Sequence, residues 1–246
     1  MLTAIFADIH ANRQAFEACL KQARERGAES IVLLGDYVGY GADPEWVTDK
    51  VRDLVDAGAM AVMGNHDSAI GNPDVQMNAA AQVAIEWTRG ELGAAQRQFL
   101  KSLPLVHQSG ETLFVHADAS NPEDWNYVLD AADAVLSMRA TRARVTVCGH
   151  VHQPAVYTMS TVGKMTAFTP VTDVPIVLLP NRQWLVVAGS VGQPRDGLSA
   201  ACYLIFDDER KEITFCRAPY DVARAADAIR QRGLPSWLAD RLLMGR

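Results

Sequence analysis

The stretch VTVCGHVHQP (residues 145–154) is an apolar run that ends abruptly at two histidines separated by one residue. The run predicts a buried strand, and His150 and His152 follow it directly. Because side chains at positions i and i+2 of an extended backbone point the same way, this spacing predicts that both imidazoles face one side of the strand end. The whole chain contains 6 histidines, so such a pair indicates a functional site.

Four other apolar runs end in the same way, at polar residues that can bind a metal ion. Buried strands are predicted at residues 2–8, 30–36, 59–67 and 112–117. The polar residues at their ends are Asp8, His10, Asp36, Asn65, His66, Asp67 and His116. Because ligands of open α/β folds bind at the carboxyl ends of the strands, we expect the five strand ends to form one rim.

The order of the elements predicts an α/β fold with two sheets. Amphipathic helices are predicted at residues 13–27, 43–58, about 77–103 and about 130–141. Their alternation with the first five strands implies a largely parallel sheet covered by helices. Short strands are then predicted at residues 164–170, 175–181, 183–190, 199–208 and 212–219, before a final helix from about Val222. These later strands are typical of an antiparallel sheet, which we expect to pack face to face against the first.

Composition predicts a globular protein of a reducing compartment. With 246 residues and 49% hydrophobic content, the chain is long enough to bury a large core. Its 4 cysteines form no C-x-x-C pair, so we expect buried free thiols and a cytoplasmic location. The sequence shows no basic leader and no apolar run of about 20 residues, which argues against secretion and a membrane span. The net charge of -6 disfavours long nucleic acids as partners but allows a small anionic substrate.

The rim residues combine imidazole and carboxylate groups without a thiolate, which favours two divalent transition-metal ions such as Mn²⁺, Fe²⁺, Zn²⁺ or Ni²⁺. Two such ions carry four positive charges, of which Asp8 and Asp36 offset two, so about +2 would remain to attract a phosphate dianion. A pair of ions also activates a bound water as hydroxide and holds the phosphoryl oxygens. Phosphoester hydrolysis is therefore the reaction that these residues support most directly.

The motifs DIHAN, GDYVGYG, GNHD, VHA and GHVHQP, in this order, resemble the signature of calcineurin-like metallophosphoesterases. With GSVGQPRDG at residues 189–197 the resemblance extends over most of the chain, and it is nearest to the small prokaryotic branch of phosphodiesterases and phosphatases. The resemblance implies a single domain over residues 1–246. The implied fold is a four-layer α/β/β/α sandwich, in which two mixed β-sheets are flanked by helices.

The resemblance also implies a role for each residue of the rim. One metal ion would be held by Asp8, His10, Asp36 and His152, and the other by Asp36 as a bridge, Asn65, His116 and His150. His66 would protonate the leaving group or stabilise the phosphoryl oxygens, Asp67 would orient His66, and Asn65 would also contact the substrate. The motif GDYVGYG lacks the arginine of the GDxxDRG motif of Ser/Thr protein phosphatases, which favours a small phosphorylated molecule or a nucleotide.

Two features near the rim have two interpretations each. Arg195 either clamps a phosphate in bidentate fashion or pairs with Asp196 in a glycine-rich turn. The loop 118–127, with Trp125 and Tyr127, either selects the substrate or is packed by its own aromatic rings. The sequence favours neither interpretation in either case.

A non-catalytic metal-binding scaffold or binding protein on the same fold is the main alternative function. Such a protein is expected to have lost His66 or several ligands, and all of them are present. A hydrolase of another fold, such as an amidohydrolase barrel, would open with H-x-H, whereas this chain opens with D-x-H. Tyr37 and Tyr40 are expected to border the rim, while His107, which has no motif around it, is interpreted as structural.

Overall fold

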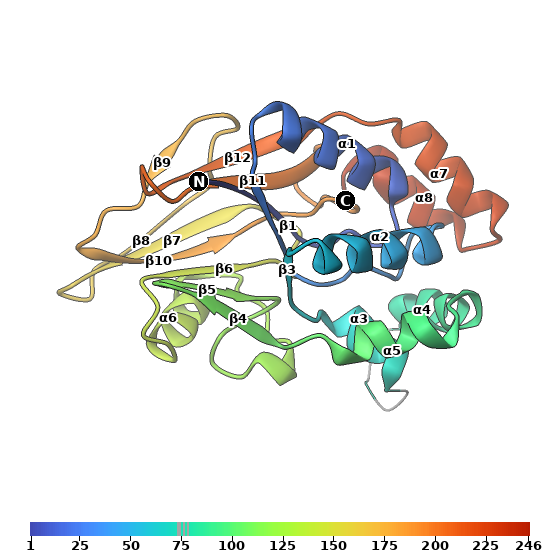
Figure 1. Ribbon diagram of the computed structural model, residues 1–246, viewed down its shortest axis with the longest axis horizontal. Helices are drawn as coiled ribbons and strands as arrows, with labels where there is room; N and C mark the ends of the chain where they lie inside the picture. Colours follow the sequence, from blue (N-terminus) through green and yellow to red (C-terminus); the bar gives the residue numbers. More distant parts are fainter. Residues whose placement is uncertain (73–74, 76, 78) are drawn as a thin grey trace.

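The computed structural model describes residues 1–72, 75, 77 and 79–246, and its strands form two six-stranded sheets (Figure 1). The first sheet has the spatial order β3 (Met60–Ala61), β2 (Ser30–Leu33), β1 (Leu2–Phe6), β11 (Ala201–Asp207), β12 (Glu212–Ala218) and β9 (Ile176–Val177). The second has the order β4 (Val106–Ser109), β5 (Thr112–Val115), β6 (Val145–Cys148), β10 (Arg182–Val187), β7 (Ala155–Ser160) and β8 (Met165–Phe168). Both sheets are mixed, because β1 pairs parallel with β2 and antiparallel with β11, while β10 pairs parallel with β6 and antiparallel with β7.

Helices lie outside the pair of sheets, some directly against a sheet and others against neighbouring helices. They are α1 (Arg13–Glu25), α2 (Pro44–Asp56), α3 (Asn65–Gly71), α4 (Ala79–Glu91), α5 (Ala94–Ser102), α6 (Ala131–Arg139), α7 (Val222–Gln231) and α8 (Ser236–Met244), with a short 3-10 helix, η1 (Pro122–Asp124). One buried cluster joins the first sheet to α1 and α2, and another joins the second sheet to α6. Because a third cluster fills the space between the sheets, the predicted four-layer α/β/β/α arrangement is confirmed (Figure 1).

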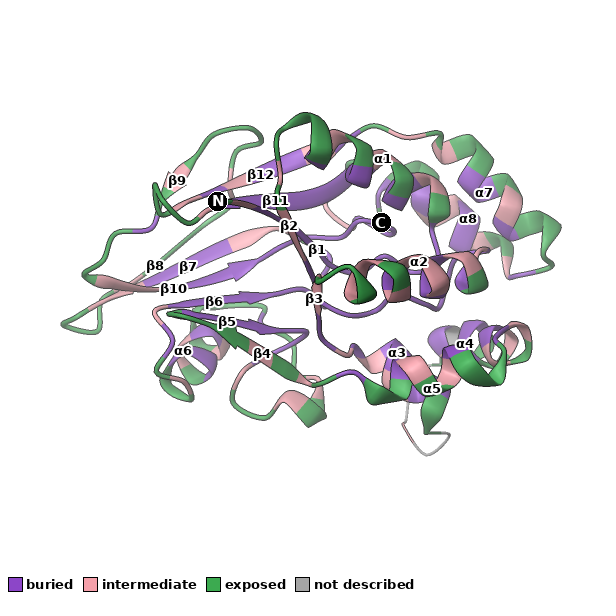
Figure 2. Ribbon diagram, in the orientation of Figure 1, coloured by how far each residue is buried: buried purple, intermediate pink, exposed green. Residues whose placement is uncertain are grey.

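Strand β1 shows why the sequence forms these layers. Its side chains alternate between two cores: Ala4 and Phe6 pack with α1, whereas Ile5 faces the second sheet. Burial of each large apolar side chain contributes about 1.5–3 kcal/mol, so a strand buried on both faces needs a continuous apolar run. Figure 2 shows the same division across the molecule, with buried central strands and helices whose outer faces are exposed.

The division of the strands between the sheets differs from the prediction. We expected the early strands in one sheet and the later strands in the other, but β11 and β12 lie beside β1, and β10 lies beside β6. The strand expected at 175–181 is reduced to the two residues of β9. Strands β4 and β7 are absent from the predicted set, and β4 contains His107. An apolar run predicts a strand but does not say which sheet it joins.

Two regions that were predicted as single helices each contain two helices. The helix expected at about 77–103 is broken at Gly93, which precedes α5 with extended angles (φ -70°, ψ 166°). Residue 78, near its expected start, lies outside the described residues. The final helix from Val222 is broken at Gly233, where φ is 72°, and the chain continues as α8.

The GNHD motif opens a helix and does not end the third strand. The strand predicted at 59–67 is limited to β3, and the three polar residues Asn65, His66 and Asp67 form the first turn of α3. The Asp67 carboxylate accepts the backbone N–H of Gly64 at 3.0 Å and so caps this turn. The motif therefore presents its side chains from a helical turn.

The cysteine prediction is confirmed by the structure. All four cysteines are buried and free: Cys19, Cys148, Cys202 and Cys216. Among the residues that the structure describes, no helix combines the length and the apolar character needed to cross a bilayer.

Candidate metal centre

The residues predicted to form a rim come together at one end of the two sheets. Within the described part of the chain, two groups of buried side chains bring their ligand atoms within 4.8 Å of one another: Asp8, His10, Asp36 and His152 in the first group, and Asp36, His116 and His150 in the second. Their loops follow β1, β2, β5 and β6, so both sheets contribute. Because Asp36 belongs to both groups, one carboxylate joins them.

The backbone carries these side chains in the left-handed conformation. Positive φ angles occur at Asp8 (55°), His10 (48°), Asp36 (54°), His150 (67°) and His152 (64°). The extended i, i+2 arrangement that we predicted for His150 and His152 is therefore wrong, because the chain has already turned out of the strand. Aspartate and histidine enter this region more readily than most residues. Backbone hydrogen bonds hold the turns, as between the N–H of His10 and the carbonyl of Asp36 at 2.9 Å.

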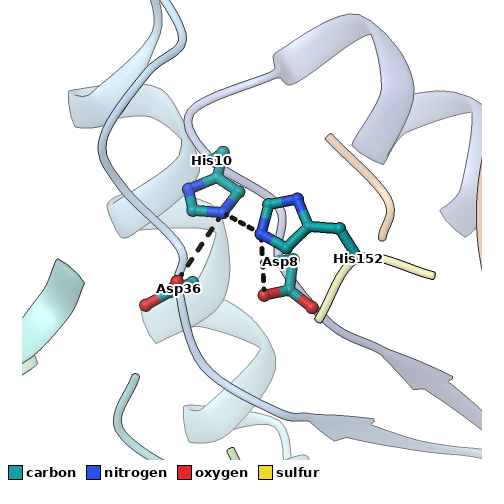
Figure 3. Close-up of side chains that lie close together, drawn as sticks. All are labelled: Asp8, His10, Asp36 and His152. Atoms are coloured by element: carbon teal, nitrogen blue, oxygen red, sulfur yellow. Dashed lines mark hydrogen bonds and ion pairs between the residues drawn. The ribbon is translucent and has the colours of Figure 1, made fainter. Parts of the chain in front are cut away.

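His10 and His152 face one another in the first group (Figure 3). The Nδ1 of His10 lies 3.1 Å from the carbonyl oxygen of Val38, and that of His152 lies 2.7 Å from the carbonyl oxygen of Gln193. A carbonyl oxygen only accepts, so each Nδ1 is assigned the proton, and the Nε2 atoms of the neutral rings carry lone pairs. These Nε2 atoms lie 3.0 Å apart. Two lone pairs at this separation repel unless a cation lies between them.

Two carboxylates point to the same place. Asp36 Oδ2 lies 3.6 Å from His10 Nε2, and Asp8 Oδ1 lies 3.4 Å from His152 Nε2 (Figure 3). The backbone N–H of His150 donates to both carboxylate oxygens of Asp8, at 3.1 and 3.0 Å, and so fixes its orientation. Four electron-pair donors therefore converge in a buried space, and this donor set fits a divalent transition-metal ion.

His116 arranges the second group in the same way. Its Nδ1 donates to the carbonyl oxygen of Leu34 at 2.7 Å, so Nε2 carries the lone pair whenever the ring is neutral, as it is in a metal ligand. That Nε2 lies 3.4 Å from Asp36 Oδ2, and 3.1 Å from both Asn65 Oδ1 and His150 Nδ1. Histidine ligands commonly donate their second N–H to a carbonyl, so this arrangement fits a second ion.

Without a cation, the two groups retain protons that offset the charge of their carboxylates. Burial raises the pKa of Asp8 to about 8, an effect that His116 opposes and Asp36 increases. Burial would lower the pKa of His116, but the Asp36 carboxylate, with a contribution from Asp8, raises it to about 9. Protons on these groups thus offset the buried negative charge at neutral pH, and a divalent cation would replace them.

His66 lies beside the two groups, with its Nε2 4.0 Å from Asp36 Oδ2 and its ring almost fully buried. Asp67 does not orient this ring. Its carboxylate accepts the backbone N–H groups of Gly64, Asp36 and Tyr37 at 2.8–3.0 Å. The predicted contact between Asp67 and His66 is therefore wrong, because consecutive side chains of a helix point in different directions. Asp67 instead fixes the loop that carries Asp36.

Arg195 does not pair with Asp196, so that interpretation is wrong. Asp196 forms its ion pair with Arg217. The guanidinium of Arg195 donates to Gln193 Oε1, at 2.8 Å from Nη2, and lies 6.0 Å from the ring centroid of Tyr40. Within the described residues it forms no ion pair, and it lines the pocket beside the two groups. Contact with a phosphate remains a prediction.

A pocket of about 200 Å³ gives access to both groups. Its lining residues are Asp36, Tyr40, Asn65, His66, Val75, Met77, Asp124, Trp125, Tyr127, His150, His152 and Arg195. Tyr40 is at the rim as predicted, but Tyr37 is fully buried, and its hydroxyl donates to the carbonyl of Val62 at 2.6 Å. Tyr37 therefore has a structural role.

The sequence gives no sign of the backbone groups that orient the histidines. The carbonyl groups of Val38, Leu34 and Gln193 fix the three rings described above. Every residue type has a carbonyl, so no side-chain pattern marks these positions. The side chain of Gln193, which holds Arg195, was also missed, and only its place between two glycine-containing turns of the 189–197 motif hints at it.

Two mixed sheets with aspartate and histidine side chains gathered at one shared rim define the metallophosphoesterase class of α/β proteins. Residues 1–211 match the calcineurin-like phosphoesterase superfamily domain. The chain therefore belongs to the calcineurin-like phosphoesterase superfamily, and the resemblance noted in its motifs is confirmed.

Individual proteins are similar over the full length of the chain. A metallophosphoesterase from Sphaerobacter thermophilus, known from its crystal structure, is 33% identical and superimposes with a TM-score of 0.88, covering 100% of both chains. The uncharacterized protein MJ0912 of Methanocaldococcus jannaschii is 34% identical over 252 aligned residues, which cover 100% of this chain and 98% of the relative. The hypothetical protein PH1004 of Pyrococcus horikoshii OT3 is 21% identical, with a TM-score of 0.80 over 100% of this chain and 98% of its own, and it supports the fold alone.

Proposed function

We propose that this protein is a dinuclear metal-dependent phosphoesterase that hydrolyses a small phosphorylated molecule or nucleotide, as a phosphomonoester or a phosphodiester. The observation that carries the proposal is the convergence of electron-pair donors around Asp36. Its Oδ2 lies 3.6 Å from His10 Nε2 in one group and 3.4 Å from His116 Nε2 in the other. Membership of the superfamily supports the reaction class.

We assign the ligands of each ion from this geometry. One ion would be held by Asp8, His10, Asp36 and His152, and the other by Asp36, Asn65, His116 and His150. The mixture of imidazole and carboxylate groups suits Mn²⁺, Fe²⁺, Zn²⁺ or Ni²⁺. Two divalent ions held there would offset the charge of the phosphoryl oxygens and activate water as the nucleophile.

Three side chains of the pocket would act on the substrate. His66 would donate a proton to the leaving oxygen or a hydrogen bond to a phosphoryl oxygen. Arg195 would bind phosphoryl oxygens through its guanidinium, which no carboxylate of the described residues neutralises. Asn65, whose Oδ1 faces His116, would donate from its amide N–H to the same phosphoryl group.

Metal reconstitution tests the proposal. Protein stripped of metal by a chelator is resupplied with Mn²⁺, and hydrolysis of p-nitrophenyl phosphate and bis-p-nitrophenyl phosphate is followed. We expect negligible turnover in the stripped protein and saturable recovery at about two Mn²⁺ ions per chain. The preferred ester would distinguish a monoesterase from a diesterase. Two bound ions with no turnover of any phosphoester would instead favour the non-catalytic scaffold.

Gly39 is expected to control the position of the His66 ring. A Cβ on Gly39 would lie 2.3 Å from His66 Nδ1, and its φ of +83° is one that other residues rarely adopt. Gly39→Ala is therefore expected to displace the ring and lower kcat about 10- to 100-fold, the scale of a misplaced catalytic group. Steady-state kinetics on the preferred ester would measure the effect.

Gly58→Ala is the matched control for this variant. Gly58 also has a positive φ, +102°, but no atom of the described residues lies within 4 Å of the position that a Cβ would take there. Both substitutions impose a backbone cost, whereas only Gly39→Ala crowds His66. Equal kinetics in the two variants would show that Gly39 does not position the ring.

A further inference from the structure

We propose that Trp125 and Tyr127, here called the aromatic wall, bind a planar aromatic group on the organic part of the phosphoester. The inference rests on the proposed function and narrows its substrate class. Both residues line the pocket that holds Asp36 and Arg195. They follow η1 in the loop 118–127, for which the sequence alone allows two interpretations.

The aromatic wall lies directly against the second group. The ring of Tyr127 stacks on that of His150, with centroids 4.1 Å apart and an interplanar angle of 20°. The ring of Trp125 meets that of His116 edge to face at 5.9 Å. A phosphoryl group bound at the candidate ions would therefore have its organic substituent within reach of these two rings.

Exposure argues against a purely packing role for the aromatic wall. Tyr127 is 46% exposed, although one face of its ring rests on His150. Its neighbour Val128 is 2% exposed and supplies the loop's anchor in the core with α6. A residue that only packed the loop would be covered like Val128, whereas Tyr127 keeps aromatic surface available.

The loop holds the aromatic wall in a fixed conformation. Trp125 has left-handed angles (φ 55°, ψ 37°), which are unusual for a bulky residue and are tolerated where the surrounding structure enforces them. The buried carboxylate of Asp118 accepts from the backbone N–H of Ser120 and from Asn126 Nδ2, and so braces both sides of η1. Rings that are already ordered lose little entropy when a planar group stacks on them.

The rest of the pocket is consistent with a substrate that is charged at one end and apolar at the other. Arg195 supplies a cation, and Tyr40 lies beside it. Val75 and Met77 add apolar surface to the same pocket as the aromatic wall. An aliphatic polyol phosphate would leave the apolar and aromatic side chains without a matching partner. An aryl or nucleoside phosphate would contact both the charged and the apolar surface of the pocket.

The test compares esters with and without an aromatic ring. Values of kcat/KM are measured with Mn²⁺ for phenyl phosphate, adenosine monophosphate and β-glycerophosphate, in the wild type, Tyr127→Leu and Trp125→Asn. Asparagine is chosen at position 125 because it tolerates left-handed angles. We expect the aromatic esters to lose about 5- to 140-fold more kcat/KM than β-glycerophosphate does, equivalent to about 1–3 kcal/mol for one stacking contact.

Leu129→Ala is the matched control, because Leu129 is 65% exposed in the same segment and does not line the pocket. Equal losses for all three esters would overturn the inference and leave the rings as supports for His150 and His116. A loss for adenosine monophosphate but not for phenyl phosphate would identify a nucleoside, and the reverse would identify a simple aryl group. Metal content is checked in each variant.

A binding measurement separates failure of the inference from failure of the proposed function. The chain has 5 tryptophans, so the difference in fluorescence between the wild type and Trp125→Asn isolates Trp125. Adenosine monophosphate is expected to quench this component in the wild type and in Leu129→Ala. Quenching without hydrolysis of any ester would support the aromatic wall and contradict the phosphoesterase. Hydrolysis that shows no preference for aromatic esters, together with an absence of quenching, would support the phosphoesterase and contradict the aromatic wall.

Discussion

Replacement of Asp36 by asparagine is expected to weaken the binding of both ions and to lower phosphoester hydrolysis in parallel. Asparagine keeps the shape, and its Oδ1 can still accept the backbone N–H of His66, which lies 2.8 Å from Asp36 Oδ1. It lacks the negative charge that both groups share. Removing one partner of a buried charge pair costs about 3–5 kcal/mol, which corresponds to about 10²- to 10⁴-fold in ion affinity. Metal content per chain and kcat/KM on the same samples would measure both effects.

Asp56→Asn provides the matched control, because Asp56 is the exposed last residue of α2. We expect this variant to keep two ions and wild-type kinetics. If Asp36→Asn behaved like the control, Asp36 would not be a shared ligand, and the proposed function would lose its main support.

Replacement of His66 by alanine is expected to lower kcat by about 10²- to 10⁴-fold while both ions stay bound, the usual range for loss of a general acid or base. The imidazole belongs to neither group of candidate ligands, and its Nε2 lies 4.0 Å from Asp36 Oδ2. The backbone N–H that fixes Asp36 is retained in alanine. Pre-steady-state kinetics and metal analysis would separate the chemical step from metal loss.

His107→Ala is the control for histidine removal, because His107 lies in β4, away from both groups. It should leave kcat unchanged. Loss of an ion from His66→Ala, with His107→Ala unaffected, would mean that His66 is a ligand and that our division between ligands and acid is incorrect.

Strands buried on both faces could be predicted because their sequences leave few alternatives. Val145–Cys148 and Leu2–Phe6 are apolar runs with one threonine each, and both are strands in the structure. Strand β4, with the sequence VHQS, is largely exposed and has no apolar run, so the same reasoning overlooks it. The pairing of β11 with β1 depends on contacts between distant segments, and local periodicity contains no information on it.

The candidate site was predictable in its side chains and not in its backbone. Aspartate and histidine at four of the five predicted strand ends include every member of the two groups. The left-handed turns at residues such as His10 were not foreseen, because Asp-x-His spacing also fits an extended strand. The resemblance to the family implied that Asp67 orients His66, whereas a helical turn directs its carboxylate to the backbone of Asp36 and Tyr37.

The origin of the ligands in both sheets has a consequence for the kinetics of folding. The first group needs Asp8, which follows β1, and His152, which follows β6, so neither sheet can form a complete ligand set alone. Complete sets exist only after the sheets have packed, so ions would bind them late in folding. Bound ions would act afterwards, as cross-links that slow the separation of the sheets. Metal loading would thus prolong the lifetime of the native protein mainly through a slower unfolding rate.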